Sequence, residues 1–262
     1  MKRFFVSVVL VLGLGIGVAA ASADAPHAIA FDSAYALGSI NGQNGWTKTG
    51  PYDANVVDVS RYPSAVGYGF GTRALQISDA VTSGSFSDQT FSPGLARPAR
   101  EGQASNSRSA GTHFEASFRI GTTRPTEQSG LHMSVSPDDG NGNRMSYLSF
   151  VDQADGVHVF FTDATFEMQD IATLDRAHAH SVRFAIDLRN GPGNDLAQVF
   201  VDGRKAVTGT TWEDYYRYAP EQAANGNHVP QISKLLFREG GEAHSADAGQ
   251  GFLVDGVDLS SR

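Results

Sequence analysis

The sequence predicts an all-β protein, built as a two-sheet antiparallel sandwich of the jelly-roll type. Many short segments alternate apolar and polar residues with a period of two, the pattern of a half-buried strand. Turn residues, chiefly Gly, Asn and Asp, separate these segments, and helical periodicity is scarce. The chain has 262 residues, a length that one sandwich domain can use completely.

The first 23 residues have the three parts of a cleavable secretory signal. Positive charges at positions 2 and 3 precede an apolar run over 4–20, and small residues follow at 21–23. We expect cleavage after Ala23, which gives a secreted, extracellular domain over 24–262. The alternative is an uncleaved anchor, but the run is glycine-rich and shorter than the about 20 residues of a typical span. No later stretch is apolar enough to span a membrane.

Charge and cysteine content restrict the partners. The formal charge is −8 and becomes −10 once two cationic residues leave with the signal. This field repels nucleic acid, whose phosphates need clustered Lys and Arg, and the sequence has no such cluster. The lack of cysteine excludes disulfides, thiolate metal sites and cysteine nucleophiles. A neutral glycan, a cation or a cationic surface is the expected partner.

The clearest strand lies at 112–120, where Phe114 and Phe118 alternate with polar residues. A hairpin is expected where Asp202-Gly203 separates two apolar alternations, because both residues tolerate the positive φ of a type I′ turn. The expected strands are 27–31, 55–59, 73–78, 112–120, 131–136, 144–151, 156–162, 181–188, 198–201 with its return through Val207, 233–237 and 251–259.

Three segments lack strand periodicity. Residues 92–111 are rich in Ser, Ala, Arg, Gly and Pro, and we expect a long exposed loop there. Residues 166–179 and 211–218 are the two places where a helical turn is expected.

Three stretches carry a family resemblance: SINGQNGW at 39–46, the segment 195–216 with its VFVDG hairpin, and GFLVDGV at 251–257. They are similar to the concanavalin-like lectin/glucanase superfamily, and within it to laminin-G-like bacterial secreted domains. The resemblance implies the jelly-roll fold. It leaves function open, because the superfamily includes lectins, glycan hydrolases, polysaccharide lyases and adhesive modules. The acidic strand Glu-x-Asp-x-x-Glu of its glucanases is missing, since the nearest strand offers only Glu115.

The outward side chains of the central strands are the first candidate ligand site. If these strands are neighbours, the polar residues form one sheet face on which a glycan chain would lie. The alternative is an ordinary solvated face, which alternation alone also predicts. The candidates are His113, Glu115, Arg119, His132 and His158.

An aromatic segment after the hairpin is the second candidate. Trp212, Tyr215 and Tyr216 lie close together in sequence, and aromatic faces stack on sugar rings. The alternative is a loop that its aromatic residues fix onto the sandwich. The other tryptophan, Trp46, lies among Asn and Gly turns.

Two patterns contain metal-ligating residue types. Asp138, Asp139, Asn141 and Asn143 resemble a calcium loop, but the EF-hand positions that need Gly and Glu hold Arg and Phe. An ordinary turn is the alternative. His178 and His180 have a spacing that suits zinc or a solvated pair. We expect no required cofactor and keep calcium at 138–143 as a candidate.

The sequence favours a secreted, non-catalytic module that binds an extracellular polysaccharide or a cell-surface glycan. The enzyme alternative is a polysaccharide lyase or glycoside hydrolase, in which Arg119 or Arg183 neutralises charge and a histidine acts as base. The third alternative is a structural or adhesive domain that binds other proteins.

Overall fold

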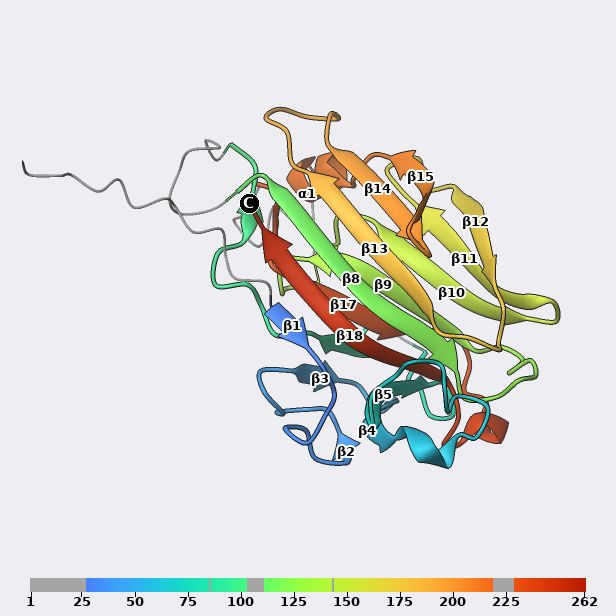
Figure 1. The fold of residues 1–262 in the computed structure, drawn as a ribbon. Helices are drawn as coiled ribbons and strands as arrows, with labels where there is room; N and C mark the ends of the chain where they lie inside the picture. The colour runs from blue at the N-terminus through green and yellow to red at the C-terminus, as the bar shows by residue number, and fades with distance from the viewer. Residues whose placement is uncertain (1–26, 85, 103–110, 143, 219–228) are drawn as a thin grey trace, which may run out of the picture.

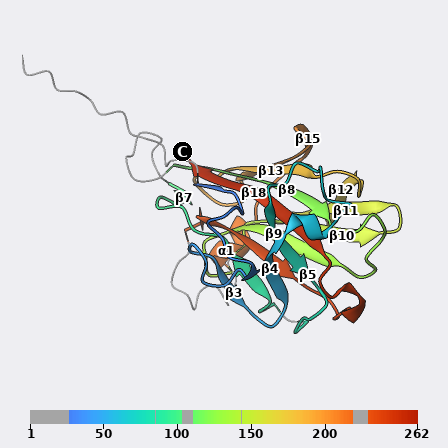
Figure 2. The same cartoon turned by 60° about the horizontal axis from the view of Figure 1, so that its bottom comes forward.

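The computed structural model describes residues 27–84, 86–102, 111–142, 144–218 and 229–262. Within these ranges the chain forms two large antiparallel sheets layered against each other, as Figures 1 and 2 show. A third sheet has two short strands. The all-β, two-sheet jelly-roll prediction is confirmed.

The nine-stranded sheet has the order β15-β14-β13-β8-β18-β5-β4-β2, and β1 also pairs with β18. The longest strands lie at its centre, where β8 pairs with β13 on one side and β18 on the other. Its strands are β1 (His27–Ile29), β2 (Gly38–Ser39), β4 (Asp53–Asp58), β5 (Arg73–Ser78), β8 (His113–Thr122), β13 (His180–Asp187), β14 (Leu196–Val201), β15 (Arg204–Gly209) and β18 (Phe252–Ser261).

The seven-stranded sheet has the order β12-β11-β10-β9-β17-β6-β3. Its strands are β3 (Thr47–Thr49), β6 (Gln89–Phe91), β9 (His132–Asp138), β10 (Tyr147–Gln153), β11 (Gly156–Thr162), β12 (Met168–Leu174) and β17 (Lys234–Glu239). The small sheet pairs β7 (Ala99–Arg100) with β16 (Gln231–Ile232). Short helices are α1 (Glu213–Tyr218), η1 (Val59–Arg61) and η2 (Ser245–Asp247).

The core lies between the two sheets and is rich in aromatic rings. Phe118 on β8 packs edge-on against Phe150 and Phe237 of the opposite sheet, with ring centroids 6.1 and 5.9 Å apart. Phe118 and Phe184 are both buried, as their alternation predicts. Trp46 also belongs to this core. It is fully buried against Phe237 and is therefore a packing residue.

The expected hairpin is confirmed at β14–β15. Asp202 and Gly203 have φ values of 49° and 74°, the positive pair that a type I′ turn requires. The helical turn expected at 211–218 is confirmed as α1.

Two local expectations are wrong. Residues 168–174 form strand β12 and no helix, because they pair with β11 at the edge of the sheet. Most of the side chains of this edge strand are exposed, so the segment lacks the apolar alternation that marks a strand. The expected loop 92–111 contains strand β7, whose Ala99 is buried. Residues 103–110 lie outside the described part of the chain.

The predicted signal at 1–23 also lies outside the described residues. Among those that are described, none of the helices has the length and apolar character needed to cross a membrane.

Candidate functional site

The five outward residues predicted to share a face do not do so. His113, Glu115 and Arg119 are on β8 of the nine-stranded sheet, whereas His132 and His158 are on β9 and β11 of the other sheet. The common face is therefore wrong. Alternation fixes which side of a strand a residue occupies, but not which sheet the strand joins.

The outward residues of β8 form ion pairs with neighbours on their own sheet. His113 Nδ1 lies 2.6 Å from Asp187 Oδ1, and Glu115 lies 3.4 Å from Arg183 Nη1. Arg119 pairs with Asp255 at 3.0 Å. This face has the features of a solvated surface whose charges neutralise each other.

The two histidines of the seven-stranded sheet have opposite environments. His158 lies between Asp170 and Asp155, whose oxygens are 2.7 and 2.9 Å from the ring nitrogens. These hydrogen bonds raise the pKa of His158. His132 is half-buried, and its pKa is lowered by burial and by the nearby positive charge of Arg238.

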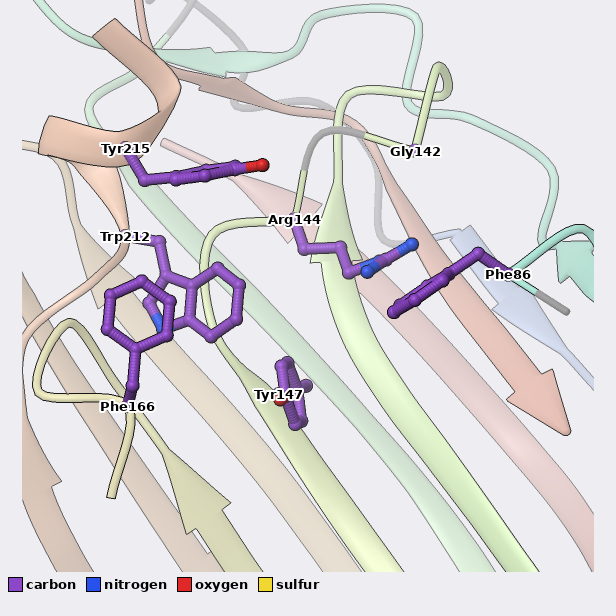
Figure 3. Close-up of a pocket in the computed structure, with 7 residues that line it drawn as sticks. All are labelled: Phe86, Gly142, Arg144, Tyr147, Phe166, Trp212 and Tyr215. Atoms are coloured by element: carbon purple, nitrogen blue, oxygen red, sulfur yellow. The ribbon is translucent and has the colours of Figure 1, made fainter. Parts of the chain in front are cut away.

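A cavity of about 390 Å³ on the seven-stranded sheet brings aromatic side chains together with a cation. We call it the aromatic cleft. Figure 3 shows its lining residues, which come from loops, from the start of β10 and from α1, far apart in the sequence: Phe86, Gly142, Arg144, Tyr147, Phe166, Trp212 and Tyr215. Its volume lies within the ~300–1,000 Å³ of small-ligand sites.

The aromatic cleft is preferred for its chemistry, not its size. A larger opening of about 520 Å³ lies among 124–129 and 243–247. Its described lining is mostly polar, with two alanines, and contains no Phe, Tyr or Trp ring. Ligand sites usually combine apolar and aromatic walls with a few convergent polar groups, as the aromatic cleft does.

Trp212 is the centre of the aromatic cleft. Its ring centroid lies 4.7 Å from Phe166, 5.0 Å from Tyr147 and 5.9 Å from Tyr215. Trp212 is largely buried, Tyr215 is 37% exposed and Phe166 is 59% exposed. A buried ring is thus surrounded by rings that are open to solvent.

Hydrogen bonds fix the chain at Trp212 and at the next residue. Its backbone N–H donates to the Met145 carbonyl at 2.6 Å, which joins this segment to the start of β10. Glu213 is buried, and its carboxylate accepts from the N–H groups of Asn194 and Asp195 at 2.5 and 2.7 Å. The cleft is therefore supported by its surroundings before any ligand arrives.

Phe166 has a strained backbone. Its φ is 61°, a conformation that costs about 1–3 kcal/mol for a residue with a bulky side chain. The Asp163 carboxylate supports this turn by accepting from Thr165 and from the N–H of Thr210. This backbone conformation places the Phe166 ring beside the Trp212 ring (Figure 3).

The Phe86 ring of the cleft is contacted by two arginines: Arg144, which lines the cleft, and Arg238, which lies beside Phe86 without lining the cleft itself. The Cζ of Arg144 lies 5.0 Å from the Phe86 ring centroid, and that of Arg238 on β17 lies 4.1 Å from it. Burial lowers the pKa of both guanidinium groups, and the charge of Arg144 lowers that of Arg238 further.

The third aromatic candidate, Tyr216, lies beneath the site. It is fully buried, and its hydroxyl donates to Asp139 Oδ2 at 3.1 Å. Trp212 and Tyr215 therefore line the cleft, whereas Tyr216 fixes α1 to the sandwich. The packing interpretation is thus correct for Tyr216, and the binding interpretation of Trp212 and Tyr215 stays a prediction.

The candidate calcium loop uses its carboxylates as turn acceptors. Asp138 Oδ1 accepts from the N–H groups of Gly140 and Gly142 at 2.5 and 3.1 Å. Asp139 Oδ1 accepts from the N–H of Asn141 at 2.8 Å. Burial raises the pKa of Asp138 to about 6. Asn143 lies outside the described residues.

The histidine pair has aspartate partners. His178 Nδ1 lies 2.9 Å from Asp175 Oδ1, and His180 Nδ1 lies 2.8 Å from Asp202 Oδ2, while His180 Nε2 is also 3.9 Å from Asp175 Oδ1. In the described ranges, no group of three or more His, Asp or Glu side chains has a metal-binding arrangement.

Sequence reasoning found Trp212 and Tyr215 but missed Phe86, Arg144, Tyr147 and Phe166. Arg144 and Tyr147 both fall within the strand expected over 144–151, but alternation does not show which distant residues the fold brings next to them. Phe86 and Phe166 lie in loops, where no periodicity places them.

Comparisons with known proteins show likeness at the level of the fold. No family model matches the chain, and no curated protein matches it. A sialidase structure is 15% identical with a TM-score of 0.53; the match covers 91% of this chain and 19% of the sialidase. The chain thus spans about a fifth of that protein's length.

Two further structures have lower scores. Lectin II from Ulex europaeus is 13% identical with a TM-score of 0.45, and the match covers 92% of this chain and all of the lectin. An alginate lyase from Pseudomonas aeruginosa is 14% identical with a TM-score of 0.42, over 72% of this chain and 82% of the lyase.

Proposed function

We propose that the protein is a secreted, non-catalytic carbohydrate-binding module, and that the aromatic cleft binds an extracellular or cell-surface glycan. One observation carries the proposal: Phe166, Tyr147 and Tyr215 surround the fixed ring of Trp212. Sugar rings have apolar C–H faces that stack on such rings. Their hydroxyls would find the Arg144 guanidinium and the tyrosine hydroxyls at the same place.

Intrinsic fluorescence tests this proposal, because the chain has two tryptophans in contrasting positions. Trp46 is fully buried in the core, so a bound glycan should change the emission of Trp212 alone. We expect saturable spectral shifts with at least one polysaccharide from a broad panel, without release of new reducing or unsaturated ends.

The Trp212→Ala variant should lose at least about tenfold in affinity, as removal of a central aromatic anchor does. Binding of the variant is measured by calorimetry, since its reporter is gone. Phe200→Ala is the matched control, because this ring lies on the nine-stranded sheet, where it stacks with Arg183. Equal affinity of the wild type and the Trp212 variant would place the ligand elsewhere, and steady product release would make the protein an enzyme.

Export is part of the proposal and rests on the N-terminal signal pattern. Sequencing of protein recovered from the medium should give Asp24 as the first residue. Full-length protein retained in the membrane fraction would contradict export and leave the glycan proposal standing.

A further inference from the structure

We propose that the glycan in the aromatic cleft is anionic, and that Arg144 and Arg238 together bind its carboxylate or sulfate group. This inference rests on the proposed function and narrows its ligand class. It also differs from the neutral glycan that the overall negative charge favours, because binding is decided by the charges at the site.

The two guanidinium groups contact the same aromatic ring, that of Phe86. They come from separate parts of the seven-stranded sheet, Arg144 from the loop before β10 and Arg238 from β17. Both stack on the Phe86 ring, with Cζ-to-centroid distances of 5.0 and 4.1 Å. Figure 3 shows the Arg144 side chain extending from the Trp212 side of the cleft towards Phe86. An anion between Trp212 and Phe86 would therefore meet cationic donors.

Both arginines retain donors that no described residue uses. The Nε atoms of Arg144 and Arg238 are buried, and neither has a hydrogen-bond partner among the described residues. Burial of an unpaired cationic donor is unfavourable, and two like charges near each other add to the cost. Burial lowers the pKa of both guanidinium groups, and the charge of Arg144 lowers that of Arg238 as well. A bound anion would accept hydrogen bonds from the unpaired donors and offset the repulsion between the two positive charges.

Three acidic groups act on the pair, and each has other interactions or is neutral in part. Asp138 acts on Arg144; its Oδ1 accepts two backbone N–H groups of its own turn, whereas its Oδ2 has no hydrogen-bond partner among the described residues. Asp88 acts on Arg238, but both of its oxygens accept from Ser83, and Oδ2 also accepts from Thr82. Glu239 also acts on Arg238, and burial raises its pKa to about 8, so it is largely neutral at pH 7.

Arginine suits this ligand class for a geometric reason. Its planar guanidinium presents parallel N–H groups that match two oxygens of a carboxylate or sulfate, and it can stack on a ring at the same time. Contact with the Phe86 ring restricts the movement of each group. The neighbouring rings of Trp212 and Tyr147 would hold the sugar that carries the anionic group.

The test compares ligands that differ only in charge. Oligogalacturonate and its fully methyl-esterified form share one sugar backbone, and dextran sulfate and dextran form the corresponding sulfate pair. Affinities are measured by Trp212 fluorescence and by calorimetry at fixed ionic strength. At least one anionic member should bind ~10- to 100-fold more tightly than its neutral partner, the range expected for charge-assisted hydrogen bonds. The pair that shows the difference distinguishes carboxylate from sulfate.

The variants Arg144→Gln and Arg238→Gln should each weaken binding of the anionic member by about tenfold or more and weaken binding of its neutral partner much less, so that most of the preference is lost. The lysine variants Arg144→Lys and Arg238→Lys retain the charge but lose the planar fork of donors. They should therefore keep only part of the preference for the anionic member. Arg183→Gln is the matched control, because Arg183 also stacks on a ring but lies on the nine-stranded sheet. Circular dichroism and thermal melting confirm that each variant is folded.

The outcomes separate the two proposals. Equal affinity for charged and neutral partners, or an unchanged preference in both glutamine variants, would overturn the anionic ligand and leave a neutral glycan in the cleft. Binding of neutral members alone would do the same. Binding that survives Trp212→Ala, or no binding of any glycan, would overturn the proposed function and this inference with it.

Discussion

The outer faces of the two sheets differ in whether their charged side chains have partners. On the nine-stranded sheet, His113 pairs with Asp187, and Arg183 pairs with Glu115 while it stacks 3.7 Å above the Phe200 ring. On the seven-stranded sheet, Arg144 and Arg238 stack on one ring, and their Nε atoms have no acceptor among the described residues.

This difference separates a solvated surface from a candidate binding surface. Opposite charges that pair at a surface contribute about 0–1 kcal/mol and need nothing further. Half-buried cations without acceptors are costly to the free protein, and a ligand that satisfies them gains that energy on binding. Residue types alone do not distinguish the two faces. The faces differ in the partners of their charged groups.

The largest expected effect is on the pH dependence of stability and concerns Glu239. This residue follows Arg238 on β17 and is fully buried. Burial and the charge of Asp79 raise its pKa from 4.5 to about 8. Between these two pH values the folded protein holds a proton that the unfolded chain releases. The free energy of unfolding should therefore fall as pH rises from about 5 to 8.5, on the order of 2–4 kcal/mol.

Urea unfolding of the wild type and Glu239→Gln at pH 5 and 8.5 measures this effect. The variant cannot ionise, so its loss of stability over this interval should be much smaller. Asp195, whose pKa is raised to about 7 by burial, has the same sign and should leave a residual slope. Glu127→Gln is the control, because this side chain is exposed and should keep the wild-type slope. Parallel slopes in the wild type and the Glu239 variant would show that Glu239 is ionised at neutral pH and compensates Arg238.

The fold was predictable from the sequence because its signal is local. Alternation at 112–120 and 181–188 identifies strands β8 and β13, and buries Phe118 and Phe184 as expected. The Asp202-Gly203 turn is likewise decided by two residues. Strand β12 was not predicted, because an edge strand with exposed side chains has no such periodicity.

The candidate site was only partly predictable because it depends on long-range pairing. Trp212 and Tyr215 were found as an aromatic segment, but their partners come from loops around 86, 144 and 166 that only the complete fold brings together. The common face of five residues failed for the same reason, since the chain changes sheets between β8 and β9. The positive φ of Phe166 has no signal in its residue type.

The smallest expected effect concerns His113 on the nine-stranded sheet. A large effect there would contradict the contrast between the two outer faces. In His113→Gln, the variant loses an ion pair at the outer face of the nine-stranded sheet, where the Asp187 side chain is 47% exposed. The free energy of unfolding should change by at most about 1 kcal/mol, the usual limit for a surface pair. Affinity for the glycan that binds best should stay within about twofold of the wild type, because the cleft is on the other sheet. Urea unfolding and calorimetric titration of the same preparation measure both quantities. A tenfold loss of affinity without loss of stability would mean that the paired charges of this face also bind ligand, and that unpaired donors do not distinguish the two surfaces.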